Sequence, residues 1–132
     1  MIVLDTHIWV WWVHGDRQLI ERYRTYLQAQ ERTQPLGVSI ISCWEIAKLV
    51  EYGRLTLPLP LEEWLNQALH YPGIRLLDLT TRIVVESTQL PGDFHRDPGD
   101  QLIVPTARVY QCPLVTMDGK MLAYPHVEKQ PS

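Results

Sequence analysis

The chain has 132 residues, of which 45% are hydrophobic, so it is long and apolar enough for one domain, residues 1–132, with a packed core. A formal net charge of −3 excludes a generally basic coat for nucleic acid but leaves room for a local basic rim. No apolar stretch approaches the roughly 20 residues of a membrane span. The N-terminus lacks the basic region of a signal peptide, and both cysteines stand at no metal-ligand spacing, so we expect a reducing, cytoplasmic setting.

The first quarter of the chain predicts one strand and two helices. Residues 1–4 are short and apolar, as in a buried strand. Asp5-Thr6 then offers an N-cap for a short helix over residues 7–14. Apolar residues recur at helical spacing between residues 16 and 33, which predicts a second helix with its arginines mostly on a solvated face.

The middle of the chain continues the alternation of strand and helix. Residues 38–41 are expected to form the second strand. Ser42 and Glu45 have the spacing of a capping box, in which each side chain bonds the backbone of the other at a helix start. An amphipathic helix over residues 61–69 and a third strand over 74–77 follow.

A further helix is predicted to begin at Thr80 or Thr81, where a hydroxyl can cap its first turn. The side chains that we expect to point inward from it are Ile83, Val84, Ser87 and Leu90.

The last third of the chain carries the clearest helix start. Asp97 stands at an N-cap position, Pro98 at the first helical position and Asp100 in the first turn. The helix should run to about residue 110, and residues 113–116 form a short apolar run of strand length.

The end of the chain offers a short helix over residues 120–123 and an edge strand near Val127, beyond which we expect the tail to fray. The whole pattern predicts an α/β fold, in which three layers (α/β/α) surround a mainly parallel sheet of four or five strands, in the order 3-2-1-4-5. Right-handed crossovers bring the C-terminal ends of all strands to one edge of such a sheet, where ligands bind.

Five acidic residues are predicted to reach this edge. Asp5 follows the first strand and Glu45 follows the second. Asp97 and Asp100 open the helix before the fourth strand, and Asp118 follows that strand. Each alone has a structural explanation as a cap, a first-turn acid or a turn former. Together they would repel one another and raise each other's pKa, a cost that a bound divalent cation removes. Oxygen ligands favour Mg²⁺ or Mn²⁺, and such a site suits phosphodiester hydrolysis by water that the metal activates.

Four segments cover nearly the whole chain and carry a family resemblance. They are LDTHIWVWW, SIISCWEIAKLVEYGRLTLP, HRDPGDQLIVPTA and PLVTMDGKMLAYP. In order and spacing they resemble the PIN-domain nucleases, most closely the VapC-type toxins of prokaryotic toxin–antitoxin pairs. The resemblance implies a PIN-like fold and a Mg²⁺- or Mn²⁺-dependent endoribonuclease that cuts RNA. It also implies inhibition by a cognate VapB-like antitoxin, and a homodimer.

The resemblance also assigns residues. The catalytic acids would be Asp5, Glu45, Asp100 and Asp118, and the same four with Asp97 would hold the metal. Thr6 and Thr116 match supporting hydroxyl positions, and Lys48 and Arg96 are candidates for contacting the substrate phosphate. For the dimer, the aromatic helix around Trp9 and Trp12 and the helix over 61–69 offer more apolar surface than one small core needs.

Two residues depart from the family pattern. Gly99 stands where a bulkier residue is usual, so the first turn of its helix is expected to be loose. Pro105 stands where alanine is usual and should kink the helix beside Asp100, because it removes a backbone hydrogen bond.

Three alternatives stay open at this point. One is a PIN nuclease without an antitoxin, and another is an inactive PIN-like binding module, for which Pro105 is the best support. The third is a phosphoacceptor receiver domain with Asp78 as the acceptor, which the lone acid after strand one disfavours. The five histidines show no paired ligand spacing and are interpreted as surface or packing residues, with His95 a weak candidate for contacting phosphate.

Overall fold

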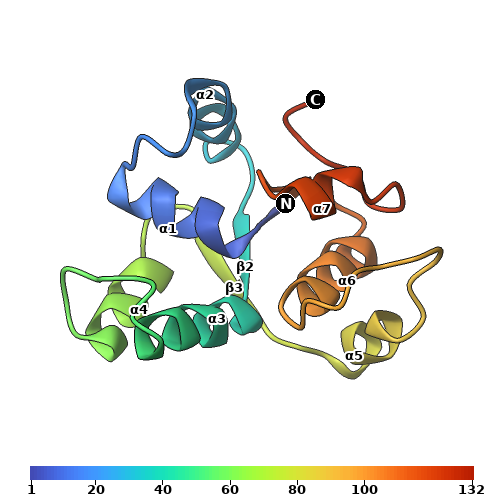
Figure 1. Cartoon of the computed structure of the whole chain (residues 1–132). Helices are drawn as coiled ribbons and strands as arrows, with labels where there is room; N and C mark the ends of the chain where they lie inside the picture. The colour runs from blue at the N-terminus through green and yellow to red at the C-terminus, as the bar shows by residue number, and fades with distance from the viewer.

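The computed structural model describes all 132 residues and contains a four-stranded parallel sheet between helices (Figure 1). The strands are β1 (Ile2–Leu4), β2 (Leu36–Ser39), β3 (Ile74–Leu77) and β4 (Leu114–Val115). Their order is β3-β2-β1-β4, and every neighbouring pair is parallel. The predicted α/β class and the order of the first four strands are therefore confirmed.

The fifth predicted strand is present only as a single bridge at the free edge of β4. Leu114 bridges Lys129 in parallel, with its N–H donating to the Glu128 carbonyl at 2.8 Å and its own carbonyl accepting from Gln130 N at 3.1 Å. The backbone of the tail is therefore held against the sheet at this point.

Helices cover the two faces of the sheet in two groups, as Figure 1 shows. The larger hydrophobic cluster packs the sheet against the first four helices, which are α1 (Thr6–His14), α2 (Glu21–Gln30), α3 (Ile40–Glu51) and α4 (Leu61–Leu69). The smaller cluster packs the other face against α6 (Asp100–Tyr110) and α7 (Gly119–Ala123), while α5 (Thr81–Ser87) lies on α6. Alternate side chains of a strand point to opposite faces, so Ile2 and Leu4 join the larger cluster and Val3 joins the smaller one.

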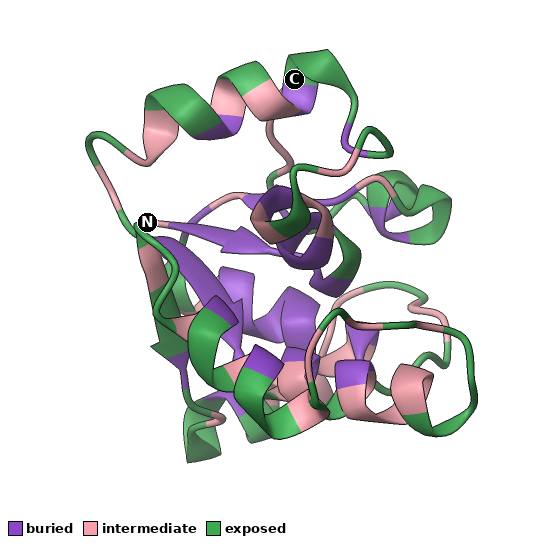
Figure 2. Cartoon of the chain, turned by 90° about the vertical axis from the view of Figure 1, so that its left-hand side faces the viewer, coloured by how far each residue is buried: buried purple, intermediate pink, exposed green.

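Burial follows this layering. All residues of β1, β2 and β4 are buried, whereas the edge strand β3 is partly exposed, and the helices bury only their inner sides (Figure 2). None of the helices combines the length and hydrophobicity needed to cross a membrane.

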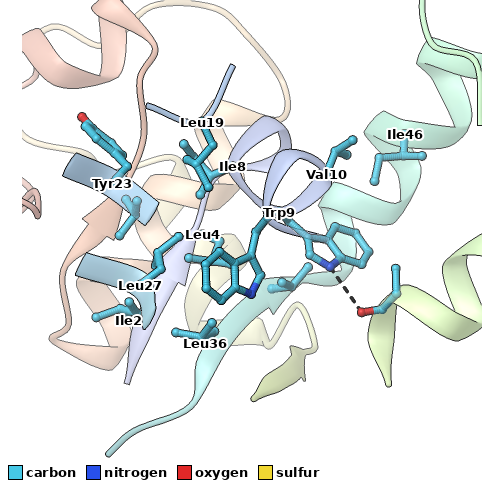
Figure 3. Packing of buried hydrophobic residues seen from close by; sticks show 14 of the residues in the cluster. Ile2, Leu4, Ile8, Trp9, Val10, Leu19, Tyr23, Leu27, Leu36 and Ile46 are labelled. Atoms are coloured by element: carbon cyan, nitrogen blue, oxygen red, sulfur yellow. Dashed lines mark hydrogen bonds between the residues drawn. The ribbon is translucent and has the colours of Figure 1, made fainter. Parts of the chain in front are cut away.

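Trp9 projects from α1 into the larger cluster, with its indole turned toward α4 (Figure 3). It is fully buried, its indole N–H donates to the Ala68 carbonyl at 3.4 Å, and its ring packs on Trp64 with centroids 5.4 Å apart. Trp9, Trp12 and Trp64 are all buried in the core of one chain, so these three rings leave little apolar surface for a dimer interface. The same packing fixes α1, whose first turn follows Asp5.

Two predicted boundaries are wrong for local reasons. The helix predicted over residues 16–33 spans only Glu21–Gln30, because Asp16 forms a turn in which its carboxylate accepts from Gln18 N at 2.8 Å. The second strand lies at Leu36–Ser39 rather than 38–41, since Ser39 is the N-cap of α3, and its hydroxyl accepts from Ile41 N at 3.2 Å.

The capping box predicted for Ser42 and Glu45 is therefore wrong, because both residues lie inside α3. On α5, Thr80 is the cap and Ile83 is buried, but Val84 is 47% exposed rather than inward.

Candidate functional site

Acidic side chains from four elements converge at the C-terminal edge of the sheet. Asp5 follows β1, Glu45 lies in the second turn of α3, Asp100 begins α6 and Asp118 follows β4. These four and Asp97 line one pocket of about 320 Å³. The structure thus brings together all five acids that the sequence placed at this edge.

Some of the other predicted residues line this pocket and some do not. Thr6 and Lys48 also line the pocket, whereas Arg96 and Asp78 do not. Arg96 therefore has no place among the pocket residues.

Asp5 is the most deeply buried acid of the site, with 6% of its surface exposed. Its Oδ1 accepts from Thr6 N at 2.7 Å, and its Oδ2 accepts from the Thr116 hydroxyl at 2.9 Å. Burial raises the pKa of Asp5 from 3.8 to about 7; the hydrogen bond from Thr116 opposes this, and the charges of Asp100 and Glu45 add to it. Asp5 is thus rigidly held and close to half-protonated at neutral pH when no cation is bound.

Thr116 links Asp5 to Asp118. Its hydroxyl oxygen accepts from Asp118 N at 3.0 Å, and its own carbonyl accepts from the Tyr23 hydroxyl at 2.8 Å. Asp118 caps α7, with Oδ2 accepting from Met121 N at 3.0 Å. The side chain of Asp118 is exposed, so its second oxygen is free to face the pocket.

Glu45 is held by Thr6 from the first turn of α1. The Thr6 hydroxyl lies 2.5 Å from Glu45 Oε1 and 2.8 Å from the Ser42 hydroxyl. A hydroxyl has one proton to donate, so Thr6 donates to Glu45 and accepts from Ser42. Burial raises the pKa of Glu45 from 4.5 to about 7 against this hydrogen bond, and the charges of Asp97 and Asp100 raise it further.

Gly99 gives Glu45 its space. A Cβ atom at position 99 would lie 2.0 Å from Glu45 Oε2, far inside any van der Waals contact. The backbone of Gly99 is helical, with φ −64° and ψ −49°, and its carbonyl accepts from Ile103 N at 2.9 Å. The loose first turn expected from this glycine is therefore wrong, and the missing side chain instead admits a carboxylate.

Asp97 acts as the predicted cap, although regular helix begins three residues later, at Asp100. Its Oδ1 accepts from Asp100 N at 3.0 Å. The Asp100 Oδ2 lies 2.5 Å from His95 Nε2, and the His95 ring stacks on Phe94 with centroids 4.3 Å apart. Burial raises the pKa of Asp100; the hydrogen bond to His95 opposes this, and the Asp97 and Asp118 charges add to it.

From the sequence, His95 is only a weak candidate for contacting phosphate, and its place among the acids is not predicted. One ligand atom each from His95, Asp100 and Asp118 lie within 4.8 Å of one another, and the same holds for Glu45, Asp97 and Asp100. The only sequence signal for His95 is its place just before the Asp97 cap, because no histidine pair has ligand spacing.

The charge of the acids is not balanced by basic side chains. The salt bridges in the structure join Lys48 to Glu51, Arg108 to Glu86 and His95 to Asp100, so no lysine or arginine pairs with a site acid. The donor set is mainly carboxylate oxygen with one imidazole nitrogen, which differs from the expected set without histidine. Converging, uncompensated carboxylates fit a hard divalent cation.

Comparison with known proteins places this arrangement in a family. A family model for the PIN domain matches residues 2–127. The chain belongs to the PIN-domain family. This confirms the resemblance that the four sequence segments carry.

Similar proteins match this PIN domain over nearly its whole length, in sequence or in fold. It is 32% identical over 125 residues to Ribonuclease VapC22 of Mycobacterium tuberculosis, covering 95% of this chain and 92% of that protein. Its fold is similar to that of a chain in VapBC2 from Rickettsia felis bound to a DNA fragment from their promoter, with a TM-score of 0.70, 20% identity and 98% coverage of both chains. DNA-bound VapBC from Salmonella typhimurium gives a TM-score of 0.68 at 17% identity, covering 98% of this chain and 96% of that one. A toxin–antitoxin complex from Klebsiella pneumoniae gives 0.64 at 20% identity, with 95% and 93% coverage.

Proposed function

We propose that this PIN-domain protein is an endoribonuclease of the VapC toxin type that depends on Mg²⁺ or Mn²⁺ and cuts RNA. The observation that carries the proposal is the pocket in which Asp5, Glu45, Asp100 and Asp118 meet with no lysine or arginine paired to any of them. The 32% identity to a protein named as a ribonuclease supports the choice of reaction.

The same four acids are proposed as the catalytic, cation-holding residues, with Asp97 and His95 beside them. Burial, with a smaller contribution from the neighbouring carboxylates, raises the pKa of Asp5 and of Glu45 to about 7, so bringing a cation beside them would favour their ionised forms. When bound, a divalent cation supplies that charge and makes water a better nucleophile near neutral pH.

The residues of the chain orient the reacting groups. Thr116 and the Thr6 N–H fix both oxygens of Asp5, and the Thr6 hydroxyl fixes Oε1 of Glu45. Asp118 keeps one oxygen free after capping α7, so it can orient the attacking water and accept its proton. Water would attack the phosphorus in place of the ribose 2′-hydroxyl, which excludes a 2′,3′-cyclic phosphate. The P–O3′ bond would break and the 3′-oxygen would leave and take up a proton, so the products carry 5′-phosphate and 3′-hydroxyl ends.

We also propose a VapB-like antitoxin as the inhibitory partner. Three structures with this fold are complexes of the toxin–antitoxin type. The guanidinium of an arginine from the partner would pair with the uncompensated carboxylates and compete with the cation. A small open reading frame next to this gene that encodes a DNA-binding protein is the expected genomic observation, and a homodimer in the cytoplasm is the expected state. Light scattering that shows only monomer at micromolar concentration would count against the dimer.

Two alternatives share the fold: a PIN nuclease that has no antitoxin, and a PIN-like module that has no catalytic activity. A PIN nuclease without an antitoxin would lack the neighbouring reading frame. An inactive module is disfavoured because α6 runs without a break from Asp100 to Tyr110 with Pro105 inside it, and Asp100 still reaches the pocket. Sequencing of RNA 5′ ends after induced expression of the wild type and of Asp5→Asn tests the proposal, since only the wild type should create new 5′-phosphate ends.

A further inference from the structure

The pocket that holds the acids has a second wall on the outer face of α3. Trp44 and Lys48 lie on α3 and Tyr52 is its C-cap, and their intervals of four residues place the three along one stripe. All three line the same pocket as Asp5 and Asp100. The stripe therefore extends the acidic site along α3 into a surface of different chemistry.

The two aromatic rings of this wall are left open to solvent. Trp44 is 46% exposed and Tyr52 is 69% exposed, and neither belongs to either hydrophobic cluster of the fold. The opposite side of α3, which includes Ile46, supplies the core packing. Core formation thus does not account for a tryptophan and a tyrosine on this face, whereas large exposed aromatic surface is typical of binding sites.

Positive charge lies directly on these rings. The Lys48 ammonium is 6.0 Å from the centroid of Trp44 and 5.5 Å from that of Tyr52, within cation–π range of both. The hydrogen bond from Lys48 to Glu51 at 3.0 Å, with the charge of Glu51, raises the pKa of Lys48, so the ammonium stays charged.

Arg54 reaches the same pocket through the turn that ends α3. Gly53 has φ +67°, and this left-handed residue lets Arg54 N donate back to the Leu49 carbonyl at 2.8 Å. Lys48 and Arg54 are the only lysine and arginine that line the pocket. The pocket therefore joins a carboxylate end to an end with two flat rings and two cations.

We propose that Trp44 and Tyr52 form a stacking platform for an unpaired base of the RNA strand, with Lys48 and Arg54 binding the phosphates next to it. This inference rests on the proposed ribonuclease function and names the substrate class as single-stranded or loop RNA. Only unpaired bases expose faces that can stack on aromatic rings, because an A-form duplex keeps its bases stacked inside. The two cations offset backbone phosphates, while the acids receive the phosphate that is cut.

The test measures binding rather than cleavage, in an Asp100→Asn parent that leaves the RNA intact. Fluorescence anisotropy follows a labelled single-stranded oligoribonucleotide, the same strand in a duplex, and single-stranded DNA of the same sequence. Trp44→Ala and Tyr52→Ala should each weaken single-strand binding by about tenfold, and Trp44→Phe should stay within about threefold of the parent. Tyr110→Ala is the matched control, because Tyr110 is a 38% exposed tyrosine that does not line the pocket. Thermal melting confirms that each variant folds.

The charged residues give an independent readout. Lys48→Ala and Arg54→Ala should each lower the slope of log affinity against log salt by about one. Glu51→Gln should tighten binding a few-fold, since it removes the only carboxylate paired with Lys48.

Three results would overturn the platform. They are equal affinities for Trp44→Ala, Tyr52→Ala and Tyr110→Ala, equal binding of duplex and single strand by the parent, or no RNA binding by the parent at all. Loss of affinity for a co-expressed protein partner, with no effect on RNA, would assign the wall to that partner instead. If the wild type cuts no RNA but the parent binds single strands through Trp44 and Tyr52, the platform stands and the proposed activity fails. Tighter binding of the DNA strand would replace RNA by DNA as the substrate class.

Discussion

Replacing Asp5 by asparagine should stabilise the cation-free protein at pH 8, although it removes a proposed catalytic residue. The pKa of Asp5 is raised from 3.8 to about 7 in the folded state. Below pH 3.8 both the folded and the unfolded states hold the proton, so the carboxyl group imposes no penalty. As the pH rises to about 7 the unfolded state loses its proton first, and the free energy of unfolding falls until the folded state has also ionised.

The size of the effect follows from the shift of about three pH units. At about 1.4 kcal/mol per unit, the ionised Asp5 costs the fold about 4 kcal/mol above pH 7. An asparagine at this position can still accept from Thr6 N, and its amide can donate to the Thr116 hydroxyl. The Thr116 proton then loses its acceptor, which costs about 1 kcal/mol. The net gain expected at pH 8 is about 3 kcal/mol.

Urea denaturation in excess EDTA at pH 5 and pH 8 measures this gain. The hydrogen-bond cost does not depend on pH, so the advantage of Asp5→Asn over the wild type should be about 3 kcal/mol larger at pH 8 than at pH 5. Added Mg²⁺ should stabilise the wild type far more than the variant, because only the wild type keeps all the proposed ligands. Asp78→Asn is the control, since Asp78 is exposed and outside the pocket. An advantage of the same size at both pH values, or a variant less stable than the wild type at pH 8 in EDTA, would refute the reasoning.

Three further substitutions test particular contacts. Gly99→Ala should lower the rate of RNA cleavage by about 10²-fold in steady-state assays, because the new Cβ displaces Glu45; a rate within twofold of wild type would contradict the contact. Thr116→Val should weaken Mg²⁺ binding by about 10- to 100-fold in calorimetric titration, since Asp5 loses a partner that orients it, and unchanged binding would count against that role. Ser39→Ala should cost about 1 kcal/mol in urea denaturation by removing the cap of α3, and a loss of cleavage at full folding would show an unrecognised role in the site.

The fold could be predicted because its signals are local. Strands and helices alternate along the chain, and each short apolar run is followed by a cap or a turn residue. Ser42 and Glu45 show the limit of such local signals. Their spacing fits a capping box, but both side chains are hydrogen-bonded to Thr6, which lies 36 and 39 residues away from them in sequence. Sequence spacing cannot reveal that a tertiary partner competes with the local one.

The acids of the candidate site could also be predicted from local signals, namely their positions near the ends of strands and helices. Asp5, Asp100 and Asp118 each stand next to the end of an element, and parallel topology brings those ends together. The contacts of His95 and Gly99 depend on how the loop before α6 folds back onto α3, and no local pattern encodes that path.

The exposed aromatic face of α3, formed by Trp44 and Tyr52, could have been predicted from the sequence. Trp44, Lys48 and Tyr52 lie on the side of the helix opposite Ile46, so the helical period alone separates the exposed face from the core face. What the sequence does not supply is that this stripe borders the acidic pocket.

The most direct test of the account is cleavage of a single-stranded RNA by the purified protein in Mg²⁺ and in excess EDTA, with analysis of the product ends. Cleavage should require the cation and yield 5′-phosphate and 3′-hydroxyl ends, and Asp100→Asn should abolish it while Asp78→Asn should not. Full cleavage in excess EDTA, or products that end in a 2′,3′-cyclic phosphate, would contradict it.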